Sequence, residues 1–84
     1  MTETKQILPK WFKGEVYQHG DIVENRFGGD SIKLNAIELS MYDFIIGASM
    51  LIEMDIATSS VDNLRKGLSW FRKNNAEAYM ILLD

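Results

Sequence analysis

The most constraining feature of this sequence is the segment from Ala36 to about Met54, which is apolar on two opposite sides when it is drawn as a helix. At about 100° per residue, one broad face carries Ile37, Met41, Phe44, Ile45, Ala48, Leu51 and Ile52. The opposite face carries Leu39, Ile46 and Met50. A helix with two apolar sides must be covered twice. The rest of an 84-residue chain can cover one side, so we expect a second copy to cover the other.

Both the start and the middle of this segment support a helix. Asn35 precedes it and Glu38 follows three residues later, the arrangement of a capping box in which side chains satisfy free backbone amides. The small residues Gly47-Ala48-Ser49 lie in its interior, where glycine costs about 1 kcal/mol relative to alanine. We expect them to permit close packing of another helix, for example at a dimer axis.

The residues before the helix predict β structure, because their apolar side chains alternate and turn residues separate them. Three short strands are predicted over 15–17, 21–27 and 30–34. Gly28-Gly29 predicts a two-residue turn with positive φ between the last two strands. In the middle strand, Val23 and Phe27 are predicted to face the core.

The last third predicts a helical pair. Ser59 or Ser60 is expected to cap a helix that begins near Val61, Asn74-Asn75 interrupts it, and residues 76–84 form a short, apolar terminal helix. The predicted class is therefore α+β: a small antiparallel β meander (about residues 15–34), a long central helix and a C-terminal helical pair. We expect one domain over residues 1–84 with a short loose N-terminus.

Composition and motifs argue against several classes of function. The chain has no cysteine and one histidine, His19, in a predicted turn, so we expect no metal, no cofactor and no catalytic residue. It shows no phosphate-binding loop, dinucleotide fingerprint or zinc spacing. Because no catalytic motif is present, we expect a protein that is not an enzyme. Without an apolar run as long as a signal peptide or a membrane span requires, we expect it to be cytoplasmic.

Seven residues are candidates for an interface or binding surface: Trp11, Leu39, Tyr42, Asp43, Ile46, Met50 and Trp70. Asp43 lies between the two apolar faces, where a carboxylate needs a partner. We expect an ion pair with Lys10, Lys13 or a C-terminal Arg or Lys, in the same chain or across a dimer. A ligand or metal contact with Glu38 or Glu53 is the alternative. Trp11 and Phe12 are expected to anchor the N-terminal residues on the core, with a protein-binding hot spot as the alternative.

Nucleic acid is a disfavoured partner, because the net charge is −3. This hypothesis stays open on one condition, that the basic residues cluster on one face: Lys10, Lys13, Arg65, Lys66, Arg72 and Lys73.

Several stretches together carry a resemblance: residues 11–14 (WFKG), 34–36 (LNA), 38–45 (ELSMYDFI) with Gly47, 67–68 (GL) and 70–80 (WFRKNNAEAYM). They resemble a family of small uncharacterised proteins that marine cyanobacterial phages encode and that occur in ocean metagenomes. The resemblance spans most of the chain from Trp11 onward. It implies a phage or marine microbial setting and expression in a host cytoplasm, and it assigns no active-site residues.

Two functional hypotheses remain. The first is a noncatalytic interaction or accessory protein that forms a homodimer or higher homo-oligomer and that binds a host or virion protein. It rests on the excess of apolar helix surface and on the lack of a catalytic motif. The alternative is a small-ligand-binding protein or minimal enzyme, with a pocket at a subunit interface lined by Trp11, Tyr42, Asp43 and Met50.

Overall fold

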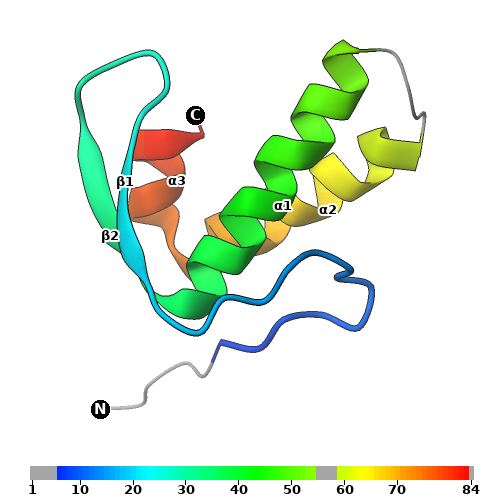
Figure 1. Cartoon of the computed structure of the whole chain (residues 1–84), viewed down its shortest axis with the longest axis horizontal. Coiled ribbons are helices and arrows are strands. Elements are labelled where there is room, and N and C mark those ends of the chain that lie inside the picture. The colour runs from blue at the N-terminus through cyan, green and yellow to red at the C-terminus, as the bar shows by residue number, and fades with distance from the viewer. Residues whose placement is uncertain (1–5, 55–58, 84) are drawn as a thin grey trace.

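The fold is α+β, a β-hairpin followed by three helices, as the sequence predicts. The computed structural model describes residues 6–54 and 59–83. The elements are β1 (Asp21–Glu24), β2 (Ser31–Leu34), α1 (Ala36–Glu53), α2 (Ser59–Asn74) and α3 (Ala76–Leu82). The hairpin lies beside α3 on one side of α1, and α2 runs behind α1 (Figure 1). None of the helices in the described ranges has the length and hydropathy that crossing a membrane requires.

The hairpin is antiparallel, with Asp21 opposite Leu34 and Glu24 opposite Ser31. The two-residue turn predicted at Gly28-Gly29 is wrong, because a loop over residues 25–30 joins the strands. The side chain of Asn25 organises this loop: its Oδ1 accepts from the N–H groups of Phe27 at 2.7 Å and Gly28 at 3.0 Å. Neither glycine has a left-handed φ, since this side-chain turn replaces the predicted backbone turn.

The two residues predicted to face the core from the middle strand behave differently. Val23 packs against the core, as predicted. Phe27 is 91% exposed, because the strand ends at Glu24 and the loop carries Phe27 away from the sheet. The guanidinium of Arg26 lies 5.4 Å from the centre of the Phe27 ring.

The strand predicted over residues 15–17 is not formed, and the described part of the chain has a two-stranded sheet. The backbone N–H of Tyr17 donates instead to the hydroxyl of Ser40 at 2.8 Å, and that buried hydroxyl donates to the carbonyl of Ala36 at 2.7 Å. This part of the chain therefore binds the first turns of α1. Gly20 then brings the chain so close to β2 that a Cβ there would collide with the carbonyl oxygen of Leu34.

The capping box predicted for α1 is confirmed. Asn35 Oδ1 accepts from the N–H of Glu38 at 2.8 Å, and Glu38 Oε1 accepts from the N–H of Asn35 at 3.0 Å. Glu38 is 6% exposed, and its Oε2 also accepts from Gln6 Nε2 at 2.8 Å and Asn75 Nδ2 at 3.0 Å. One buried carboxylate thus joins the N-terminal residues and the starts of α1 and α3.

The core lies where α1, α2, α3 and β2 meet, and its buried members are Leu34, Met41, Ile45, Phe71, Ala78 and Leu82. Residues 6–17, here called the N-terminal segment, cover the start of α1 (Figure 1). Trp11 and Phe12 anchor this segment as predicted, with ring centres 6.0 Å and 5.1 Å from that of Phe44. The sequence predicts a short loose N-terminus, and its first five residues lie outside the described ranges.

The C-terminal helices confirm the predicted break and correct the predicted cap. Because α2 begins at Ser59, both Ser59 and Ser60 lie inside its first turn and neither precedes it. Asn75 separates the two helices and caps α3, its side chain accepting from the N–H of Ala78 at 3.0 Å. Ala78 and Leu82 bury one side of α3 in the core, whereas Met80 on the other side is exposed.

Candidate functional site

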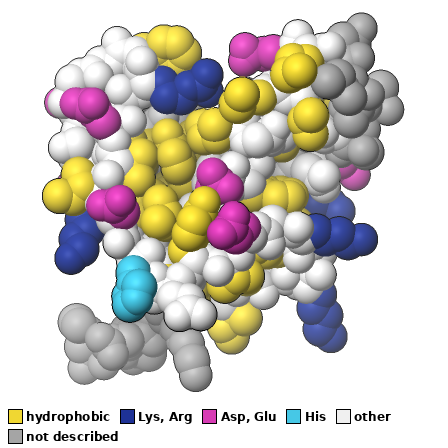
Figure 2. Space-filling model, viewed as in Figure 1, with side chains coloured by type: hydrophobic (Ala, Val, Ile, Leu, Met, Phe, Trp, Pro, Cys, Tyr) yellow, Lys and Arg dark blue, Asp and Glu magenta, His cyan; other side chains and the backbone are white. Residues whose placement is uncertain are grey.

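A groove lined mostly by apolar side chains lies along the last turns of α1 and is called the apolar groove here. It encloses about 450 Å³, and its lining includes Phe44, Gly47, Met50 and Leu51 from α1, Met54 just after the helix and Asn63 from α2. Met50 is 51%, Leu51 39% and Met54 60% exposed. Hydrophobic side chains gather over this half of α1 (Figure 2). Exposed apolar groups concentrated in this way are typical of binding surfaces.

The two faces of α1 are covered unequally along its length. Leu39, at the start of the second face, packs against the core, and Ile46 is half-buried. Met50, one further turn along, is exposed. Gly47 is also exposed, and a Cβ built on it would have no atom within 4 Å. The chain therefore covers both faces of the first turns of α1, while the end of the helix remains accessible.

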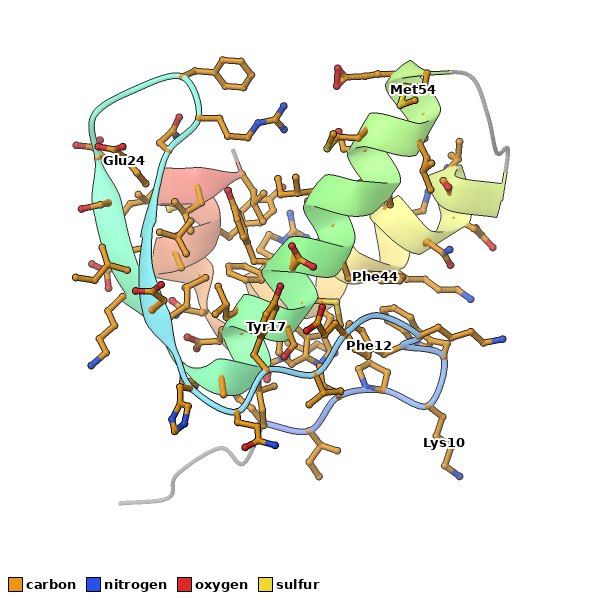
Figure 3. The ribbon with its side chains drawn as sticks, in the orientation of Figure 1. Lys10, Phe12, Tyr17, Glu24, Phe44 and Met54 are labelled. Atoms are coloured by element: carbon orange, nitrogen blue, oxygen red, sulfur yellow. The ribbon has the colours of Figure 1, made fainter. Side chains whose placement is uncertain are left out.

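Asp43 lies at the rim of the apolar groove and has Tyr17 as a neighbour. The Tyr17 phenol extends across α1 (Figure 3). Its pKa is raised above the ordinary tyrosine value, first because the ring is partly withdrawn from water and then because the carboxylates of Asp43 and Glu15 disfavour a phenolate. The sequence predicts a Lys or Arg partner for Asp43, in the same chain or across a dimer; Tyr17 is a neighbour that the chain itself supplies.

Tyr42 and Ile46, two further predicted site residues on α1, do not line the apolar groove. Tyr42 is half-buried, with its ring centre 6.4 Å from that of Phe71. Burial raises the pKa of Tyr42, and the Arg26 guanidinium acts in the opposite direction. Ile46 borders a smaller groove of about 190 Å³ beneath the hairpin loop. Of the pocket predicted from Trp11, Tyr42, Asp43 and Met50, a single chain brings only Asp43 and Met50 together.

Trp11 and Trp70 line a second groove, of about 430 Å³, between the N-terminal segment and α2; we call it the cationic groove. Arg65, Lys66 and Lys73 also line it, and Lys66 Nζ lies 5.8 Å from the centre of the Trp11 ring. Other basic residues point elsewhere: Arg72 lies 6.0 Å from the Tyr79 ring centre, and Lys10 points outward (Figure 3). The six predicted cations therefore cluster only in part.

Acidic residues that the sequence offered as metal ligands are not assembled for that purpose. Glu38 is buried and hydrogen-bonded by Gln6, Asn35 and Asn75. Within residues 6–54 and 59–83, no group of at least three His, Cys, Asp or Glu side chains is placed to hold a metal ion. His19 lies exposed before β1.

Sequence reasoning missed Leu51 and Met54 as surface residues. Leu51 follows the periodicity of the buried face, and periodicity does not show where the covering elements end. The spacing of seven between Lys66 and Lys73 was the available signal for the cationic groove, since it places both side chains on one face of a helix.

No protein family, curated protein or solved structure matches this chain. The two grooves are therefore interpreted from their own residues and geometry.

Proposed function

We propose that this chain is a noncatalytic interaction protein that assembles as a homodimer through the last two turns of α1. The observation that carries the proposal is the exposure of Met50, Leu51 and Met54 around the apolar groove. Full burial of a side chain of this size contributes about 1.5–3 kcal/mol. Two copies would bury six such side chains against each other.

Gly47 gives this surface a shape suited to a second helix. Its exposed position has open space where a Cβ would lie, so the partner's backbone can approach closely. When two helices meet at small residues, the distance between their axes lies at the lower end of the usual range of about 8–10 Å. The penalty of glycine inside a helix is thus offset by contact between the two copies.

An antiparallel crossing at Gly47 also separates the acidic residues. A two-fold axis places the same surface of each copy together. Counting outward from Gly47, Asp43 of one copy then meets Leu51 of its partner, and the two Asp43 positions lie about 12 Å apart along the helices. Repulsion across that distance is largely screened at physiological salt.

An accessory role in a phage or marine microbial setting, with a host or virion protein as a further partner, is part of this proposal. It is supported by the resemblance of residues 11–14 and 70–80 to the phage family and by the exposed apolar surface. Self-association is the part of this proposal that can be tested directly on the purified protein.

The test is the solution mass of the protein by light scattering over a dilution series through the micromolar range. We expect a dimer that dissociates on dilution. Met50→Glu should give a monomer, because a carboxylate at the centre of an apolar interface loses its hydration. Met80→Glu is the matched control: Met80 is exposed on α3, and this variant should remain dimeric.

Circular dichroism of each variant establishes that the helices are intact. A wild-type protein that stays monomeric throughout the series would refute self-association. A dimer that persists in Met50→Glu but is lost in Met80→Glu would place the interface on α3 instead.

A further inference from the structure

We propose that the cationic groove binds a nucleoside phosphate, with the base stacked on tryptophan and the phosphate held by basic residues of α2. The ligand is either a free nucleotide or one unit of a short single strand. The inference rests on the juxtaposition of Trp11 and Trp70 with Arg65, Lys66 and Lys73 around one groove, and it is independent of the apolar groove.

Both indole rings are held in place before any ligand arrives. Trp70 Nε1 donates to the carbonyl oxygen of Ile7 at 3.2 Å, and its ring lies edge-on to Phe71 with centres 6.4 Å apart. Trp11 rests on Phe44 at 6.0 Å. Because both rings are only half-buried, each still offers surface to the groove. Rings ordered in advance lose little conformational entropy on binding.

The charge of the groove is opposite to that of the chain. The protein carries a net charge of −3, yet three of its nine basic residues line this groove. Among the described residues that line it, none is acidic. Lys66 and Lys73 stand on one face of α2 with Ser69 between them. Lysine ammonium and arginine guanidinium groups form strong, charge-assisted hydrogen bonds to phosphate.

A flat aromatic surface beside clustered cations selects a ligand that is both planar and anionic. Nucleobases stack on aromatic side chains regardless of sequence, while the backbone phosphates follow basic residues. The volume of about 430 Å³ falls in the range of about 300–1,000 Å³ usual for small-molecule sites. The overall negative charge favours a single nucleotide or a short strand over a long polyanion. An acidic peptide would satisfy the cations and leave the indoles unstacked.

Tryptophan fluorescence, excited where tyrosine does not absorb, reports on this groove, because the sequence has two tryptophans and both line it. We would titrate the protein with AMP and with a short oligothymidylate. Adenosine, ribose 5-phosphate and a tetraglutamate peptide would serve as probes that lack one of the required features. We expect saturable quenching by AMP, by the oligonucleotide, or by both, and at least tenfold weaker binding of the other three.

Two charge-matched variants locate the site. Lys73→Gln should weaken AMP binding about fivefold to tenfold, whereas Arg72→Gln should leave it unchanged, because Arg72 lies over Tyr79 and outside the groove. Tighter binding of the oligonucleotide, with a steeper loss between about 50 and 200 mM salt, would identify the single strand as the ligand. Tighter binding of AMP would identify the free nucleotide.

Absence of saturable quenching by AMP and by the oligonucleotide up to about 1 mM would overturn the proposal. Equal affinity for adenosine or ribose 5-phosphate would also overturn it, since either the phosphate or the base would then be unnecessary. Binding of tetraglutamate as tight as that of AMP would reassign the groove to acidic peptides. An equal loss in Arg72→Gln and Lys73→Gln would show a general charge effect instead of a site.

Discussion

Replacing Gly47 by alanine should stabilise the monomer and weaken the dimer. Gly47 lies in the interior of α1, and a Cβ there meets nothing within 4 Å of the same chain. The substitution therefore keeps only the gain in helix propensity, about 1 kcal/mol. For a domain of this size that gain corresponds to a rise in Tm of about 4–8 °C.

Gly67→Ala is the internal comparison, because it makes the same chemical change inside α2. There a Cβ would lie 2.7 Å from Cγ1 of Ile45, a side chain that is fully buried in the core. An overpacking cost of about 1–3 kcal/mol opposes the propensity gain. We therefore expect Gly67→Ala to lower the free energy of unfolding while Gly47→Ala raises it.

Folding and association must be measured separately. Urea denaturation of both variants in a Met50→Glu background gives the free energy of unfolding of the monomer. Light scattering of Gly47→Ala in the wild-type background gives the dissociation constant, which should rise about tenfold or more because the new methyl group keeps the helices apart. Stabilisation by both substitutions, or a Gly47→Ala dimer as tight as wild type, would refute the reasoning.

Three further predictions concern hydrogen bonds and ionisation. Glu38→Gln should lower the free energy of unfolding by about 1–3 kcal/mol, because an amide cannot accept all the hydrogen bonds of this buried carboxylate. Glu24 is exposed, and Glu24→Gln should change the free energy of unfolding by less than about 0.5 kcal/mol in the same urea titration. Equal losses in the two variants would contradict the role of Glu38. Since the pKa of Tyr17 is raised in the folded protein, its contribution to stability is complete below pH about 10 and is lost as pH rises through the raised pKa. Asp43→Asn should lower this pKa in an ultraviolet titration of the phenolate, in which Tyr17→Phe identifies the Tyr17 signal. An unchanged titration curve in Asp43→Asn would argue against contact between the two side chains. Asn25→Ala should cost about 1–2 kcal/mol in thermal denaturation, because two loop amides lose their acceptor; an unchanged Tm would show that the loop does not depend on this side chain.

The sequence predicted the elements whose signals are local. The capping box at Asn35 and Glu38 fixed the start of α1, and the break at Asn75 was read from residues that terminate and cap helices. Such signals act within one turn of a helix, so a single sequence contains them in full.

Features decided by contacts between distant residues were not predictable. The Gly28-Gly29 dipeptide favours a tight turn, but Asn25 bonds the loop amides and also donates to the carbonyl of Ile81 on α3. The predicted first strand gave way to a bond between Tyr17 and Ser40, residues far apart in sequence. Of the candidate site, the exposed Met50 was found, but Leu51 was missed because it shares the periodicity of the buried face.

The N-terminal segment closes the chain on itself, and this affects the order of folding. Gln6 bonds to Asn74 and Ile7 to Trp70, pairs separated by 68 and 63 residues. Closing loops of this length costs entropy before the contacts repay it, so we expect this segment to dock after α1 and α2 have paired and to detach first. The groove between Trp11 and α2 then exists only in the last-formed state, and a bound ligand would prolong the lifetime of that state and slow its amide exchange.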